Sequence, residues 1–357
     1  MDSYIILAIN PGSTSTKIAV YANDKNVFLK NIKHSTEELQ PFEKITDQFE
    51  FRKEVILKEL KEAGIDLTSI KAVVGRGGLV KPIESGVYGV NDALKADLRK
   101  GVMGEHASNL GGLIADDIAK AIGAAAYIAD PVVVDEMEEV ARFAGHPLFS
   151  RLSIFHALNQ KAIARIYATQ VGKKYEEMNL VVAHLGGGIS VGAHRQGRVV
   201  DVNNALDGEG PFSPERAGTL PAGQLAKLCF SGEYTHEQIK KIICGKGGLV
   251  GYTCSNDAYQ LQLKMEAGDA EAKLIQDAMS YNICKWIGMM AAVLKGKVDA
   301  VILTGGMAHN PHIVEYVKDM VSFVAPVVVY PGEDEMAALA MNGLLVLRGE
   351  VSPRVYA

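Results

Sequence analysis

Short apolar runs separated by turn residues open the chain and return in its second half. Residues 4–10 and 16–22 are apolar runs, and residues 26–32 alternate between apolar and polar side chains. The segments 10–13 and 23–25, which contain Asn, Pro, Gly and Asp, separate these runs. Such runs are typical of β-strands, so the chain is predicted to begin with three strands.

Helical periodicity follows in residues 49–63, and Gly64 is a typical C-terminal stop. A short buried strand is predicted at residues 71–74. Two further helices are expected at residues 92–99 and 106–122, before a strand that ends at Asp130.

A second group of strands is predicted from residue 179. Residues 179–184 form an apolar run, residues 189–195 alternate, and residues 196–198 form a turn. Helices are expected from there to about residue 296. The last predicted elements are strands at 298–303 and 327–330 and a helix at 334–348. Strands that alternate with helices indicate an α/β protein.

The two groups of strands resemble each other. The segment around Asn10 and the segment around His184 each contain an apolar strand, a polar residue, a glycine-containing tight turn and an exit strand. A third glycine turn, Gly305-Gly306, follows the later strand that ends at residue 303. One unit built twice predicts two duplicated domains that face each other across a central cleft.

Composition and charge narrow the class of protein. The 357 residues are 48% hydrophobic and 22% charged, with a net charge of −5, and Lys and Arg are not clustered. Nucleic acid and anionic membranes are therefore not expected as partners. The first residues have no basic segment followed by a long apolar stretch, so a cytoplasmic protein is expected. The four cysteines have no zinc-binding spacing and are expected to be reduced thiols.

The glycine turns are candidates for phosphate binding. A strand–turn–strand hairpin can present successive backbone N–H groups to an anion, and glycine lets the backbone approach closely. The turn after Asn10 adds the hydroxyls of Ser13 and Ser15 and the ammonium of Lys17. A plain hairpin with a polar loop is the alternative for any single turn.

Other nucleotide and metal motifs do not fit. A Walker loop needs Gly before its Lys, but Thr16 precedes Lys17. No Gly-x-Gly-x-x-Gly opens a helix after a strand, and protein-kinase signatures are absent from the sequence. The segment from Asp201 begins like a calcium loop but has Leu206 at the position that requires Gly.

Arg76 and Arg216 lie in glycine-rich loops, where a guanidinium can bind an anion through two parallel hydrogen bonds. A surface salt bridge is the alternative for each. His156 and His184 could donate to a phosphate or could be histidines satisfied within the core, and local sequence does not decide between these interpretations.

Seven motifs occur in order along nearly the whole chain, and together they resemble the acetate kinase family. That family belongs to the larger group that contains sugar kinases, chaperone ATPases and actin. The resemblance implies two duplicated actin-like ATPase (ribonuclease H-like) domains, comprising residues 1–133 with 336–357, and residues 134–335. The motifs are residues 10–17, 75–78, 155–156, 184–188, 215–221, 304–306 and 331–335.

The resemblance also implies roles for individual residues. Arg76 and Arg216 would hold the transferring phosphoryl group and the acceptor carboxylate, His156 would stabilise the transition state, and Asp130 resembles an essential Asp. One of Glu333 and Glu335 would serve Mg²⁺, to which Asn10 could contribute indirectly. The nucleotide would be bordered by Asn10, Ser13, Ser15, Lys17, His184, Gly186, Gly187, Gly188, Gly305 and Gly306.

The sequence departs from the acetate pattern at two places, and the second, the loss of an Asp-x-Arg, favours the branch of the family that takes butyrate or isobutyrate. Gly187 stands where that pattern has Asn, and residues 257–259 read Asp-Ala-Tyr where it has Asp-x-Arg. The expected function is reversible, direct in-line transfer between ATP and a short-chain fatty acid, with Mg²⁺ as cofactor. A homodimer or an assembly of dimers is implied.

The chemistry agrees with this expectation. A carboxylic acid is already ionised at neutral pH, so it needs no general base to attack phosphorus. The difficulty is repulsion between two anions, which fixed cations and hydrogen-bond donors relieve. A sugar or polyol kinase would instead need an Asp as base, which Asp130 could supply. A non-kinase actin-like or chaperone-like ATPase is the second alternative.

Overall fold

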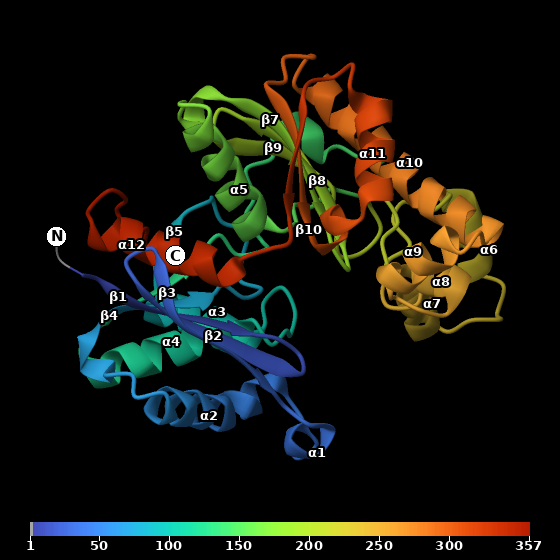
Figure 1. The fold of residues 1–357 in the computed structure, drawn as a ribbon. Helices are drawn as coiled ribbons and strands as arrows, with labels where there is room; N and C mark the ends of the chain where they lie inside the picture. Colours follow the sequence, from blue (N-terminus) through green and yellow to red (C-terminus); the bar gives the residue numbers. More distant parts are fainter. Residues whose placement is uncertain (1–2) are drawn as a thin grey trace. The chain divides into compact units, whose positions relative to one another are not determined.

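A computed structural model describes residues 3–357. The chain divides into two compact units. Unit 1 runs to Val134 and also contains Asp334–Ala357, whereas unit 2 comprises Asp135–Glu333 (Figure 1). None of the helices within the described residues combines the length and apolar character needed to cross a bilayer.

Unit 1 is built on a six-stranded sheet with the strand order β3-β2-β1-β4-β6-β5. The first three strands are antiparallel neighbours, and β4 then joins β1 in parallel. The strands are β1 (Ile5–Pro11), β2 (Ser15–Ala22), β3 (Lys25–Lys33), β4 (Ile70–Arg76), β5 (Val87–Gly89) and β6 (Ala125–Ala129). The helices are α1 (Thr36–Leu39), α2 (Phe49–Glu62), α3 (Asp92–Lys100), α4 (Asn109–Ile122) and α12 (Glu335–Leu347).

Unit 1 buries both faces of its sheet. Leu7, Ile9 and Val73 pack with α2 and α4 in one apolar cluster. Ile6 and Val74 point to the opposite face, where they approach Gly343 of α12. Successive side chains of a strand point to opposite faces, so a run of continuous apolar residues is what a sheet covered on both faces requires.

Unit 2 repeats this plan with a five-stranded sheet in the order β11-β10-β7-β8-β9. Its first three strands are again antiparallel neighbours, and β10 joins β7 in parallel. The strands are β7 (Asn179–Leu185), β8 (Ile189–Arg195), β9 (Arg198–Val202), β10 (Ala300–Gly305) and β11 (Val327–Pro331). The matching strand orders confirm the duplicated actin-like architecture.

The sheet of unit 2 is also covered on both faces. Leu180 and Val182 pack on α5, and Val181 and Ala183 pack on the side of α10 and α11. A group of shorter helices, α6 to α9, precedes α10 in the chain (Figure 1). The helices are α5 (Ala157–Gln170), α6 (Ala222–Cys229), α7 (His236–Ile243), α8 (Leu249–Thr253), α9 (Ala258–Glu266), α10 (Ala270–Val293) and α11 (Pro311–Val321).

The sequence-based elements agree with these bounds except at a few ends. The helix expected from residue 106 begins at Asn109. Asn109 is the first residue of the helix, and its side chain accepts a hydrogen bond from the Leu79 backbone N–H, at 2.8 Å, and donates to the Gly104 carbonyl. The strands β5 and β9 and the helices α1 and α5 were not predicted, and β10 begins two residues later than expected.

Helix α4 lies directly on β4 at a contact between two glycines. A Cβ on Gly75 would be 2.1 Å from the carbonyl oxygen of Gly111, and a Cβ on Gly111 would be 2.3 Å from that of Arg76. No larger residue fits at this contact without moving the helix. The glycine pair therefore fixes the backbone that carries Arg76.

We expect Gly75→Ala to cost roughly 1–3 kcal/mol of stability, the usual cost of overpacking, and to lower activity because Arg76 is displaced. Gly288→Ala is the matched control, because a Cβ on Gly288 of α10 meets no atom within 4 Å. This control should gain roughly 0.5–1 kcal/mol, since Ala favours helix over Gly. Thermal unfolding of both variants checks the prediction, and equal melting temperatures would contradict it.

Candidate active site

The end of β1 brings three of the predicted site residues of unit 1 together. Arg76, at the end of β4, forms a two-pronged ion pair with Glu335, with both N–O distances at 3.0 Å. Asn10 donates from Nδ2 to the same carboxylate at 2.5 Å. Glu335 is the first residue of α12, so the start of that helix delivers a carboxylate to the ends of β1 and β4. The Arg76 side chain is 23% exposed, so this ion pair is partly buried.

Asp130 follows β6 in the neighbouring position of the sheet, because Arg76 pairs with Ala129. It is 2% exposed, and its Oδ1 accepts hydrogen bonds from Ser85 Oγ at 2.6 Å and from the Gly86 backbone N–H at 2.8 Å. Two donors to one oxygen fix the orientation of this carboxyl group. Asp130 therefore lies at the same sheet edge as Arg76.

The turn between β1 and β2 presents the predicted phosphate-binding side chains. A hydrogen bond from the Gly12 N–H to the Ser15 carbonyl, at 2.7 Å, closes the turn. Ser13 and Lys17 are exposed, and Lys17 pairs with Asn10 across the two strands. The turn is thus a tight hairpin whose hydroxyls and ammonium are open to a ligand.

In unit 2 the two predicted histidines are stacked. The rings of His156 and His184 lie with centroids 3.8 Å apart and planes inclined by 10°. His184 Nδ1 is 2.8 Å from Asn159 Oδ1, and its Nε2 is 3.3 Å from Glu333. The Asn159 oxygen can only accept, so it orients the N–H of His184 Nδ1. The two carboxylates with open assignments therefore have different surroundings, since Glu335 contacts Arg76 and Glu333 contacts His184.

A chain of buried hydrogen bonds orients His156. Tyr175 OH is 2.7 Å from His194 Nδ1, and His194 Nε2 is 2.9 Å from Gln160 Oε1. Gln160 Nε2 donates to Ser190 Oγ at 2.7 Å, and Ser190 Oγ is 2.9 Å from His156 Nδ1. Burial lowers the pKa of His194 well below its usual value, which matches its place inside the chain as a neutral ring.

This chain of bonds determines which nitrogen of His156 carries the proton in the neutral ring. Ser190 Oγ accepts from Gln160 Nε2 and, at 3.4 Å, from the His156 backbone N–H, so both of its acceptor positions are used and its own hydrogen is available for His156 Nδ1. With Nδ1 as acceptor, the N–H of a neutral His156 is at Nε2. The ring is therefore oriented to donate from Nε2.

Arg216 contacts the glycine turn that follows β7. A Cβ on Gly188 would lie 1.7 Å from Arg216 Nη1, so only glycine leaves room for the guanidinium. Arg216 Nη1 donates to the Ala205 carbonyl, and Ser213 Oγ donates to the Gly187 carbonyl at 2.7 Å. Arg216 Nε is buried and has no hydrogen-bond partner among residues 3–357. The arrangement leaves this guanidinium with donor capacity for an anion.

The third glycine turn closes β10. The backbones of Gly305 and Gly332 exchange two hydrogen bonds of 2.9 Å. A Cβ on Gly305 would meet the Leu185 carbonyl oxygen at 2.4 Å, whereas none of the described atoms lies within 4 Å of a Cβ on Gly306. Gly305 is required by packing, and Gly306 faces open space.

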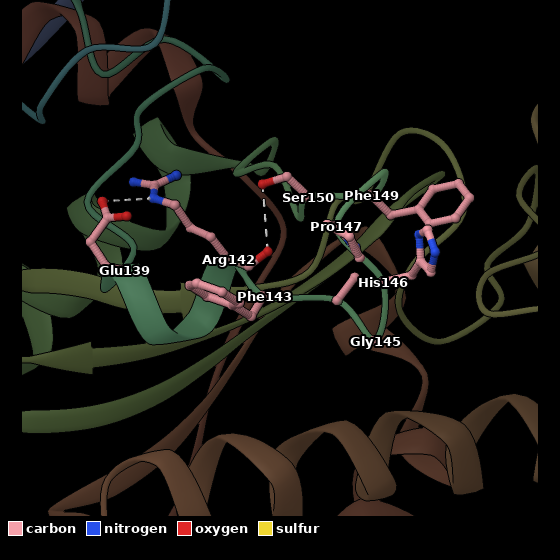
Figure 2. Close-up of a pocket in the computed structure, with 9 residues that line it drawn as sticks. Glu139, Arg142, Phe143, Gly145, His146, Pro147, Phe149 and Ser150 are labelled. Atoms are coloured by element: carbon pink, nitrogen blue, oxygen red, sulfur yellow. Dashed lines mark hydrogen bonds and ion pairs between the residues drawn. The ribbon is translucent and has the colours of Figure 1, made fainter.

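Figure 2 shows a pocket of about 440 Å³ in unit 2, in the segment between Glu139 and Ser150. Its rim includes Phe143 and Phe149, which are 81% and 68% exposed. None of the predicted site residues lines it. The pocket therefore takes no part in the chemistry that those residues could perform.

Several polar residues near the site were not predicted. Asn159, Gln160 and Ser190 hold the two histidines, and Arg52 binds the turn after β1. A signal for Arg52 exists in the sequence, because Arg52, Ile56 and Leu60 recur every four residues and all are buried on one face of α2. A charged residue in an apolar helical stripe indicates a buried polar contact.

Comparison with known proteins identifies the family of this chain. The model of the acetokinase family matches residues 149–326. Butyrate kinase 2 of Clostridium acetobutylicum is 56% identical over 351 residues, which is 98% of this chain and 99% of that protein. Butyrate kinase 1 of the same organism is 57% identical over 353 residues, with 99% of each chain covered.

Solved structures agree on the fold. The acetate kinase of Porphyromonas gingivalis is 21% identical with a TM-score of 0.77, covering 97% of this chain and 100% of that one. A propionate kinase from Francisella tularensis is 18% identical with a TM-score of 0.73, covering 95% and 98%. The chain therefore belongs to the acetokinase family, and it is a phosphotransferase with a carboxyl group as acceptor.

Proposed function

We propose that the protein is a butyrate kinase, which transfers the γ-phosphoryl group of ATP directly and reversibly to butyrate or isobutyrate. The single observation that carries the substrate is the identity of 56–57% to two butyrate kinases over nearly the whole chain. The geometry supports the reaction class, because each unit holds an arginine beside other polar groups from the predicted motifs, Arg76 at the end of β4 and Arg216 against the glycine turn after β7.

The proposed roles follow from the chemistry of an ionised acceptor. Arg76 and Arg216 balance the negative charge of the carboxylate and of the transferring phosphoryl group. His156 donates from Nε2 to an oxygen of that group, and Asp130 is an essential carboxylate of the same sheet edge. No proton needs to be removed from the acceptor, so no general base is assigned.

The remaining predicted residues are proposed to bind the nucleotide. Lys17, with the hydroxyls of Ser13 and Ser15, is proposed to border its phosphates, and so are His184, Gly186, Gly187 and Gly188. Gly305 and Gly306 are proposed to lie against the adenosine. The open space at Gly306 supports this assignment.

Mg²⁺ is the implied cofactor, and the residues present suit it. Mg²⁺ prefers oxygen ligands and is usually held by one or two carboxylates with substrate phosphates. The Glu335 carboxylate, fixed beside Asn10 of the phosphate turn, offers such a ligand. We propose that Glu335 rather than Glu333 serves the metal. When bound, Mg²⁺ would neutralise charge on the phosphates.

The metal assignment predicts a difference between two variants. Glu335→Gln should raise the Mg²⁺ concentration needed for half-maximal activity by about 10- to 100-fold, the usual effect of losing a group that supports a metal. Glu333→Gln should change it little, because that carboxylate contacts His184. Activity titrated with Mg²⁺ at saturating ATP checks this. A shifted requirement in Glu333→Gln alone would assign the metal to Glu333.

We also propose that the two compact units are the two domains of a cytoplasmic enzyme that works as a homodimer or an assembly of dimers. Native mass measurement tests the oligomeric part. A monomer at working concentrations would contradict it.

The proposed activity is tested by trapping the product. Purified protein with ATP, Mg²⁺ and butyrate or isobutyrate should give an acyl phosphate that hydroxylamine converts into a hydroxamate. Direct in-line transfer should also invert the configuration of a chiral γ-phosphoryl group. Retention would contradict direct transfer, and phosphorylation of glycerol or a hexose without phosphorylation of four-carbon acids would favour the sugar-kinase alternative.

A further inference from the structure

Arg52 is a buried cation, and its hydrogen-bond partners within the described part of the chain include no carboxylate. Its side chain projects from α2 into unit 1, and it has no exposed surface. Burial lowers the pKa of Arg52 to about 10, which leaves the guanidinium charged at neutral pH. No ion pair to Arg52 occurs among residues 3–357. A charge buried without a counter-ion is costly, so its retention calls for a reason.

The Arg52 guanidinium donates hydrogen bonds to backbone carbonyl oxygens of the turn after β1. Its Nη1 donates to the carbonyls of Gly12, at 2.8 Å, and Ser15, at 3.0 Å. Its Nη2 donates to the carbonyl of Ser13 at 3.0 Å. Three backbone carbonyls of one short turn therefore point at one side chain.

This arrangement orients the amides of the turn outward. In a trans peptide the C=O of one residue and the N–H of the next point in opposite directions. Carbonyls of Gly12 and Ser13 that face Arg52 consequently turn the N–H groups of Ser13 and Thr14 away from it. Both of these residues are exposed. The N–H groups are thus available to an anion on the side opposite the cation.

The other partners of Arg52 are neutral. Gln48 Oε1 accepts from Nε at 3.0 Å and from Nη2 at 2.8 Å. Thr16 Oγ1 accepts from Nη1 at 3.0 Å and lies 2.8 Å from His34 Nε2. Burial, and next the charge of Arg52, lower the pKa of His34, so this ring is neutral as well. None of these side chains carries a negative charge that would cancel the positive charge of Arg52.

We propose that Arg52 is a positioning residue for the phosphate-binding turn, and that its uncompensated charge strengthens the binding of nucleotide phosphates. The inference rests on the proposed function, in which this turn binds ATP. If Arg52 only stabilised the fold, its charge would not need to remain unpaired, because a Glu in place of Gln48 could accept the same hydrogen bonds.

Gln48→Glu separates these two roles. The substitution keeps an acceptor oxygen in place but adds a negative charge against Arg52. We expect the variant to melt at or above the temperature of the wild type, because the carboxylate pairs with the buried cation, and to bind ADP and ATP with Mg²⁺ about tenfold more weakly, since a nearby buried charge is poorly screened. KM for ATP should rise more than kcat falls.

Gln238→Glu is the matched control. It makes the same change in net charge at an exposed helix start, where Gln238 completes a capping box that accepts Gln or Glu equally. Its nucleotide affinity should equal that of the wild type. Calorimetric titration of wild type and both variants with Mg·ADP gives the comparison.

Each outcome decides a different claim. Unchanged affinity in a folded Gln48→Glu variant of an active enzyme would overturn the role of Arg52 alone. A wild type that neither binds Mg·ADP nor forms acyl phosphate would overturn the proposed function, and this inference with it. If Gln48→Glu does not fold, Arg52→Lys is tested in its place. Lysine keeps the positive charge but lacks the planar guanidinium that donates to several carbonyls, so the affinity for Mg·ADP should fall about tenfold. Wild-type affinity in Arg52→Lys would overturn the positioning role.

Discussion

Alanine at Arg76 or Arg216 should lower kcat by on the order of 10³ or more in folded protein, the scale of arginines that stabilise a phosphoryl-transfer transition state. Their charge matters most when negative charge accumulates between the carboxylate and the phosphoryl group. ATP binding should suffer much less, because the glycine turns and Mg²⁺ are proposed to carry the ground-state contacts. Lysine should rescue only poorly, since an ammonium lacks the planar fork.

Arg142→Ala is the matched control for this prediction. Arg142 also forms a two-pronged ion pair, with Asp135, and its side chain is 26% exposed, close to the 23% of Arg76. Such a pair contributes about 0–1 kcal/mol when it is only structural. Arg142→Ala should therefore leave kcat nearly intact. A loss below tenfold in both Arg76→Ala and Arg216→Ala, with unchanged melting, would refute the assigned roles.

His156→Ala should lower kcat by roughly 10²- to 10³-fold, as does removal of one donor from a preorganised anion site. The reason is the hydrogen-bond chain that fixes Nδ1 as acceptor and leaves Nε2 to donate. Ser190→Ala keeps the ring but removes the group that selects its tautomer. It should cost less than His156→Ala, because the ring remains but is no longer held in one tautomer.

Measurement of kcat and KM across pH for both variants tests this role. Tyr175→Phe is the control, because it removes a hydroxyl at the far end of the chain of bonds, beyond His194. It should retain most activity. Equal losses in Ser190→Ala and Tyr175→Phe would indicate a general loss of packing instead of control over the His156 tautomer.

Much of the fold follows from local patterns in the sequence. The two antiparallel groups of strands are short apolar runs separated by turns, and the repetition of this pattern is enough to predict the duplication. Helix α4 is an exception at its start, because the Asn109 side chain binds the backbone of Leu79, thirty residues earlier. A contact between distant segments leaves no periodic signal.

The candidate site also contains some residues that local sequence patterns reveal and others that depend on contacts between distant segments. The glycine turns stand out in the sequence because Gly lets the backbone approach an anion closely, and both arginines stand out because they lie in glycine-rich segments that could bind an anion. The sequence alone could not indicate which of Glu333 and Glu335 is the better candidate for the metal. That depends on where α12 begins and on which strand ends lie beside its first residue. The network of Arg52 was missed because three of its partners are backbone carbonyls, which leave no signal in a sequence.

The central claim, that a short fatty acid is the phosphoryl acceptor, is tested most directly by kcat/KM for a series of acids of two to six carbons, measured with saturating ATP and Mg²⁺ beside glycerol and glucose. We expect the highest value for butyrate or isobutyrate and no turnover of the two alcohols. Acetate as the best substrate would contradict the butyrate assignment, and turnover of glycerol or glucose without turnover of any acid would contradict the claim itself.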